Sequence, residues 1–202
     1  MKGQRDLMSI PTKEQTSRFL APLRGNLSIL LLHETETKMN VSRFMLRCAS
    51  LQSIDTTILD ADAFYCTNME RFAEDALSIS DGEVLLLPEQ EFEVSSLVPL
   101  LSSKRQLLIV DDLNSLYSLA SDARKSQQLT ILMKLLSHNA RMNSSWVIAT
   151  AYRTELDHRQ SAMNQRSLTA LGDLLIDTDS HADSIKLKSS FKGHWTNGEF
   201  SL

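Results

Sequence analysis

Apolar residues follow two different spacings along this 202-residue chain. Continuous apolar runs of strand length, such as Leu27–Leu32, alternate with segments in which apolar residues recur every three or four positions. The first pattern is typical of strands buried on both faces of a parallel sheet, and the second of helices that bury one face. The predicted strands are 27–32, 56–59, 84–87, 107–110 and 146–150, and the predicted helices are 39–51, 68–79, 94–101 and 123–141.

The C-terminal part of the chain departs from this alternation. Three short stretches, 173–177, 184–188 and 199–202, predict closing strands without helices between them. We therefore expect an α/β fold in which a mainly parallel sheet is flanked by helices and extended by short antiparallel C-terminal strands. Residues 1–22 are polar and interrupted by Pro11 and Pro22, so they predict an N-terminal arm or capping helix before one core domain, 23–202.

Composition narrows the class of protein. The chain is 42% hydrophobic and 23% charged, as in ordinary globular proteins, and its net charge of −4 disfavours a protein coated in nucleic acid while allowing a local basic patch. No apolar run approaches the roughly 20 residues of a membrane helix, and the first residues lack the apolar core of a secretory signal. We expect an intracellular protein without a membrane partner, cytoplasmic, or nuclear in a eukaryote.

The most informative motif is the sequence LLIVDD, which ends in Asp111 and Asp112. In P-loop NTPases an acid at the end of such a strand, the Walker B acid, holds Mg²⁺ opposite a glycine-rich phosphate loop. This chain has no glycine between Gly25 and Gly82 and no GxxxxGK[ST] sequence. Asp111 and Asp112 therefore have a second interpretation, as acids that cap the following helix or bond a neighbouring loop.

Five segments in order resemble the core of the RecA/RadA recombinase family, which includes the KaiC-like ATPases. The segment 24–32 is similar to the strand that enters the phosphate loop, and LDADAFY (59–65) to the family's D-T-E-G-x-F, with Asp62 at the position of the water-activating glutamate. The other three segments that resemble parts of this family are LLIVDDLNSLY, the helix and strand of 126–150, and the closing strands 171–176 and 186–192. The resemblance covers about residues 23–202 and implies a RecA-like three-layer fold.

The phosphate loop of that family is degenerate here. Glycines allow its backbone to turn N–H groups onto phosphates, and two carboxylates in this chain, Glu34 and Glu36, would add negative charge beside them. Lys38 could be a displaced Walker lysine, although no glycine precedes it and no serine or threonine follows it. We expect a pseudo-ATPase without ATP, Mg²⁺ or another cofactor. The degenerate loop is His33, Glu34, Thr35, Glu36, Thr37 and Lys38.

Basic residues define a candidate DNA interface. The family's second DNA-binding loop corresponds to a segment after residue 150, and its first to the start of the 123–141 helix. A solvated surface loop is the alternative, because Glu155 and Asp157 dilute the positive charge. Trp195, in a polar turn, is a candidate partner contact. The candidate DNA contacts are Arg124, Lys125, Arg153, His158, Arg159 and Arg166.

The sequence gives little support for a metal centre or a catalytic triad. The five histidines show no metal-ligand spacing, and no serine lies in a GxSxG motif, so neither a metal centre nor a catalytic triad is predicted. Asp60 and Asp62 are also interpreted as helix-capping or solvated side chains rather than as catalytic acids.

Three functions follow. The first is a non-catalytic RecA/RadA-like paralogue that assembles with an active RecA-family ATPase in homologous recombination and DNA repair, with single-stranded DNA as a further partner. The second is a structural subunit of another RecA-like assembly, either an Elongator-type tRNA-modification ring or a KaiC-like regulator. The third is a divergent ATPase that uses Lys38, Asp62 and Asp111. The first two imply a hetero-oligomer.

Overall fold

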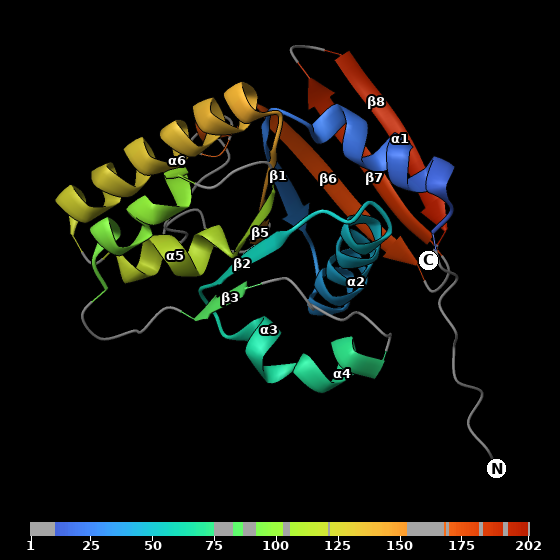
Figure 1. Ribbon diagram of the computed structural model, residues 1–202, viewed down its shortest axis with the longest axis horizontal. Coiled ribbons are helices and arrows are strands. Elements are labelled where there is room, and N and C mark those ends of the chain that lie inside the picture. Colours follow the sequence, from blue (N-terminus) through green and yellow to red (C-terminus); the bar gives the residue numbers. More distant parts are fainter. Residues whose placement is uncertain are drawn as a thin grey trace.

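The computed structural model describes residues 11–74, 83–86, 92–102, 106–120, 122–152, 168, 170–181, 184–191 and 194–201. Its centre is an eight-stranded sheet with the strand order β3-β2-β4-β5-β1-β6-β7-β8 (Figure 1). Neighbouring strands from β3 to β6 are parallel, and β7 and β8 continue the sheet antiparallel. The strands are β1 Leu27–Leu32, β2 Thr56–Asp60, β3 Glu83–Leu86, β4 Leu107–Asp111, β5 Trp146–Tyr152, β6 Leu174–His181, β7 Ser184–Phe191 and β8 His194–Ser201.

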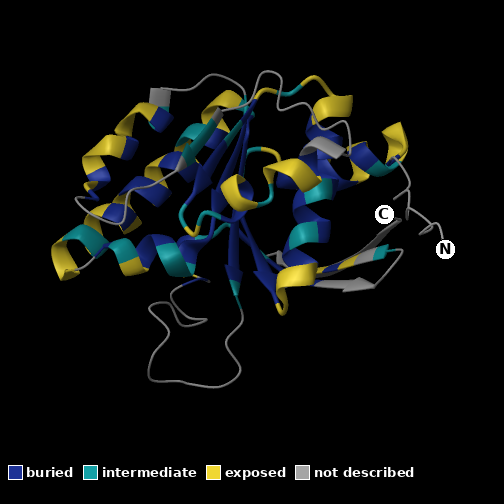
Figure 2. Ribbon diagram, turned by 90° about the horizontal axis from the view of Figure 1, so that it is seen from below, coloured by how far each residue is buried: buried dark blue, intermediate teal, exposed yellow. Residues whose placement is uncertain are grey.

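Helices cover both faces of the sheet. One apolar cluster joins α1, α2, α3 and α4 to one face, and a second joins η1, α5 and α6 to the other, so the central strands are buried between them (Figure 2). This arrangement confirms the predicted α/β class and is consistent with a RecA-like three-layer fold. The helices are α1 Lys13–Leu23, α2 Thr35–Leu51, α3 Phe64–Thr67, α4 Met69–Glu74, the 3₁₀ helix η1 Val94–Ser102, α5 Leu113–Leu119 and α6 Ala123–Asn143.

The N-terminal helix is part of the packed structure. Thr12 and Gln15 form a reciprocal capping box that begins α1. Phe19, on α1, meets Phe44 of α2 edge to face, and the indole N–H of Trp146 in β5 donates to the carbonyl of Leu20 at 2.8 Å. The helix therefore caps the α2 side of the sheet, and it extends across the boundary predicted at residues 22 and 23.

Some predicted element bounds are wrong. Helix α2 begins at Thr35 rather than at residue 39, because without glycines the backbone passes from β1 into a helix after only His33 and Glu34. The helix predicted over 94–101 is a 3₁₀ helix that contains Pro99. The closing strands β6 to β8 are each eight residues long, longer than the apolar stretches that predicted them, because backbone pairing continues through polar positions.

A close approach between β1 and the turn before β6 leaves little space for a side chain at position 172. A Cβ placed there would lie 2.8 Å from Cδ1 and 3.0 Å from Cγ1 of the fully buried Ile29. We expect Gly172→Ala to lower the free energy of unfolding by about 1–3 kcal/mol, measured by urea denaturation.

The double variant Gly172→Ala/Ile29→Val tests this cause. Ile29→Val removes the methyl group nearest to the new Cβ and should alone cost about 0.5–1.5 kcal/mol. The double variant should lose less than the sum of the two single losses. Strict additivity would show that some other contact limits position 172.

Candidate functional site

Acidic side chains gather where the parallel strands end. Asp60 ends β2 and Asp111 ends β4, and the two residues are partners in the strand register. Asp62 follows β2 by two residues, and Asp112 begins α5 as its N-cap, accepting a hydrogen bond from the backbone N–H of Ser115 at 2.7 Å. The carboxyl edge of an open parallel sheet is where α/β proteins bind their ligands. The helix-capping interpretation is confirmed for Asp112.

Lys38 reaches into these acids from the first turn of α2, and its side chain is fully buried. Its Nζ lies 2.6 Å from Oδ2 of Asp62, 2.8 Å from Oδ2 of Asp111 and 3.9 Å from Oδ2 of Asp112. The ammonium is also 4.3 Å from the centre of the Phe64 ring, within the range of a cation–π contact. One cation therefore joins three acids from two strand ends.

Further hydrogen bonds hold the carboxylates in place. Oδ1 of Asp111 accepts from the hydroxyl of Thr150 in β5, and Oδ2 of Asp60 accepts from the backbone N–H of Cys66 at 2.9 Å. Oδ1 of Asp62 accepts from the backbone N–H of Phe64 at 3.2 Å, so Asp62 turns the chain into α3 while its other oxygen binds Lys38. The acids are thus fixed by the backbone as well as by the lysine.

Burial and charge oppose each other in this cluster. Burial alone would lower the pKa of Lys38, but the carboxylates of Asp111 and Asp62 outweigh it, so the pKa is raised and the ammonium stays charged. Burial raises the pKa of Asp111 from 3.8 to about 7, against the opposing effects of Lys38 and Thr150. Burial also raises the pKa of Asp112. The pKa of Asp111 thus lies near neutral pH, and that of Asp112 is shifted in the same direction.

The residues that follow β1 do not form a phosphate-binding loop. Only His33 and Glu34 separate β1 from α2, and Thr35, Glu36, Thr37 and Lys38 form the first helical turn instead of a phosphate-binding loop. Oxygens of Asp60, Asp62 and Asp111 lie within 4.8 Å of one another, close enough for a divalent cation to bridge them. The single positive charge of Lys38 is shared between two of these three acids, Asp62 and Asp111, and Oδ1 of the third, Asp60, is buried without a hydrogen-bond partner among the described residues.

Of the predicted DNA contacts, the structure describes only Arg124 and Lys125. Arg124 is exposed at the start of α6, whereas Nζ of Lys125 donates to the carbonyl of Phe92 at 2.8 Å and lies 2.9 Å from a carboxylate oxygen of Glu93. The other candidates lie outside the described residues, as does the side chain of Trp195 in β8. Those outside are Arg153, His158, Arg159 and Arg166.

Sequence reasoning considered Lys38 as a phosphate ligand and missed its role as the counter-ion of Asp62 and Asp111. A usable signal was present, because Lys38 lies soon after a buried parallel strand and Asp111 ends another, and such strands share one carboxyl edge. Thr150, which binds Asp111 from β5, was also missed.

No protein-family model matches the chain, and no curated protein matches it. The resemblance to the RecA/RadA family therefore stays a prediction from the sequence. Within the described residues, no helix combines the length and the apolar character needed to cross a membrane.

Removing the lysine charge tests the ion pair. We expect Lys38→Met to lower the free energy of unfolding by about 3–5 kcal/mol, because it leaves Asp111 and Asp62 without their counter-ion. Lys13→Met, at an exposed position in α1, is the matched control and should change stability by less than about 0.5 kcal/mol. The double variant Lys38→Met/Asp111→Asn should recover part of the loss. A Lys38→Met protein as stable as the wild type would contradict the assignment.

The raised pKa of Asp111 predicts a pH dependence. The folded protein holds this proton more tightly than the unfolded chain, so the stability that the proton contributes is complete below pH 3.8 and is lost as the pH rises towards about 7. The free energy of unfolding of the wild type, minus that of Asp111→Asn, should therefore fall across this window. Urea denaturation at a series of pH values measures the difference. A flat or rising difference would mean that Asp111 is ionised throughout.

Proposed function

We propose that this protein is a non-catalytic RecA/RadA-like subunit that works by association with an active RecA-family ATPase. The observation that carries the proposal is the buried Nζ of Lys38, at 2.6 Å from Asp62 and 2.8 Å from Asp111. The lysine is held by the acids at the strand edge. Nucleotide hydrolysis, in contrast, would need those acids free to bind Mg²⁺ and a lysine free to bind phosphate.

Opening this site for a nucleotide would be costly. Lys38 would have to leave two close carboxylates in a buried position, and separating a buried ion pair costs on the order of 3–5 kcal/mol. The first N–H groups of α2 could bind an anion, but the N-cap residue there is Glu34 and the first turn contains Glu36, and both carboxylates would repel a phosphate. An active ATPase with a divergent loop is therefore the weaker proposal.

Association is supported by what the chain retains. The sheet, both helical layers and the strand edge have the arrangement expected of a RecA-like core, and the family that the sequence resembles assembles by docking one core against the next. A subunit whose site is filled by its own ion pair would offer a neighbour the same face in every nucleotide state. It could support an active partner without turnover of its own.

The pathway rests on the resemblance. Homologous recombination and DNA repair follow from the segments similar to DNA-binding loops, and a tRNA-modification ring is the second candidate. One contact favours a role without tight single-stranded DNA binding. Lys125, in the segment similar to the family's first DNA-binding loop, is already paired with Glu93. Binding of an oligo-dT strand would support the recombination role, and preferential binding of tRNA would support the ring.

Isothermal titration of MgATP into the purified chain tests the absence of a nucleotide site. We expect no measurable heat of binding, because Lys38 is held by Asp62 and Asp111 and is not free to bind phosphate. Micromolar binding that Asp111→Ala abolishes would refute the proposal and favour the divergent ATPase. A second experiment tests association: purification of the tagged chain from its source should recover a partner that carries an intact GxxxxGK[ST] sequence. A chain recovered alone and monomeric would count against association.

A further inference from the structure

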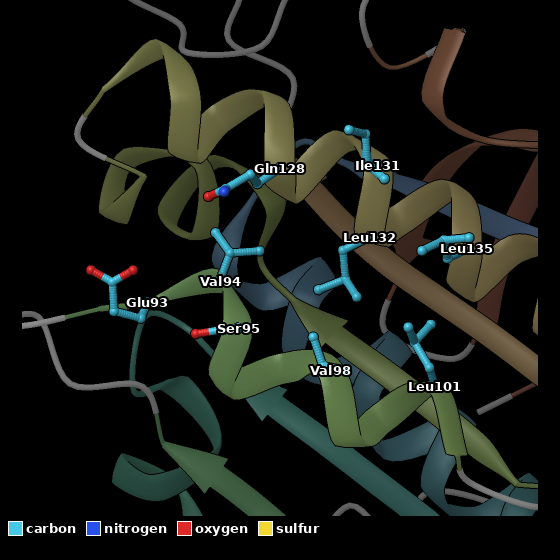
Figure 3. A pocket seen from close by; sticks show the side chains of 9 residues that line it. All are labelled: Glu93, Val94, Ser95, Val98, Leu101, Gln128, Ile131, Leu132 and Leu135. Carbon is cyan, nitrogen blue, oxygen red and sulfur yellow. The ribbon is translucent and has the colours of Figure 1, made fainter.

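On the sheet face opposite Lys38, η1 and α6 enclose an open apolar groove of about 320 Å³ (Figure 3). Leu132 lies buried in it, whereas three further apolar side chains in its walls are about half exposed: Val98 at 51%, Ile131 at 53% and Leu135 at 47%. Single exposed apolar residues are common, but neighbouring ones gathered in one groove are typical of contact surfaces. The groove thus differs from the closed, polar strand edge.

Polar contacts fix the groove at both ends. At one end Nζ of Lys125, in α6, donates to the carbonyl of Phe92 and pairs with Glu93 just before η1. At the other end the side-chain amide of Asn139, in α6, donates to the carbonyl of Leu101 at 2.8 Å. These contacts keep η1 and α6 at a set distance, so the groove is formed before anything occupies it, which lowers the entropic cost of binding.

The lining favours apolar side chains over a polar small molecule. Its polar members are Glu93, Ser95 and Gln128, and the only charged one, Glu93, is already paired with Lys125. Small-molecule sites place several polar groups to orient the ligand, whereas a groove between helices with apolar walls accepts the apolar face of another helix.

Charge identifies the kind of helix. Helix α6 has four basic residues and no acidic one, in a chain whose net charge is −4. Lys125 and Arg141 pair with Glu93 and Asp173, and Lys134 donates to the carbonyls of Ala170 and Leu171. Within the described part of the chain, no carboxylate pairs with Arg124. Arg124 precedes Gln128 by four residues, on the same helical row as Ile131 and Leu135. A carboxylate on the occupant would meet Arg124 at the end of the groove.

We propose that the groove between η1 and α6 binds an acidic amphipathic helix of a partner protein, through apolar residues spaced along one face and a carboxylate near Arg124. This contact is separate from the strand edge and does not rest on the proposed function. It would operate whether or not the partner is an ATPase.

Peptide display on the full-length chain tests the proposal. The probe is a random library of peptides about 14 residues long, roughly four helical turns, selected on the wild type and counter-selected on Ile131→Gln. The enriched peptides should carry apolar residues at spacings of three, four and seven and a net negative charge. Failure to enrich peptides, or enrichment of neutral or basic ones, would overturn the proposal.

The affinities of the wild type and its variants for one synthesised peptide, measured by fluorescence anisotropy, test single residues of the groove. Ile131→Gln and, on the opposite wall, Val98→Gln should each weaken binding about tenfold, and Arg124→Gln should weaken it severalfold and reduce its salt dependence. Met142→Gln is the control, because Met142 is 70% exposed on the same helix but does not line the groove, and it should leave the affinity within about twofold.

Circular dichroism should show all four variants folded. Equal weakening by Met142→Gln would overturn the assignment to the groove. Self-association of the wild type that Ile131→Gln abolishes, measured by sedimentation velocity, would assign the groove to a second copy of the chain and also overturn the proposal.

Discussion

The ammonium of Lys38 is the constraint on which the carboxyl edge of the sheet depends. A fully buried cation is tolerated only when carboxylates and hydrogen bonds replace its lost water, and here Asp62 and Asp111 do so at 2.6 and 2.8 Å. These acids come from the ends of β2 and β4, and the lysine comes from α2. The pair therefore ties together elements that are distant in sequence and fixes how α2 sits over the strand edge.

The same interaction engages the lysine that a phosphate-binding site would need free. A phosphate-binding loop needs glycines, open backbone N–H groups and a lysine with no internal partner. In this chain Thr35 to Lys38 form a helical turn, and the lysine is directed to the acids that would otherwise hold a metal ion. The early start of α2 and the burial of the lysine are linked, because a helix that begins at Thr35 places Lys38 within reach of Asp111.

The sequence predicted the sheet better than the site. The strand Leu27–Leu32 was predicted at its true bounds and the strands β2 to β5 to within two residues, because a short, continuous apolar run is typical of a strand buried on both faces. Asp112 was correctly considered as a helix cap, since that contact is local. The pairing of Lys38 with Asp111 was missed because it joins distant segments, and Lys38 had been assigned to a loop. The 3₁₀ form of η1 was missed because the apolar spacings of the two helix types differ little over nine residues.

The carboxyl edge of the sheet and the groove between η1 and α6 differ in the groups that they leave without a partner. At the strand edge, Lys38 pairs with Asp62 and Asp111 within the chain, while Oδ1 of the buried Asp60 has no hydrogen-bond partner among the described residues. Between η1 and α6, Val98, Ile131 and Leu135 still expose about half of their surface to water, and only another molecule can remove that cost. Apolar contact in the groove between η1 and α6 can therefore contribute free energy of binding, which supports the proposal that this chain acts through association.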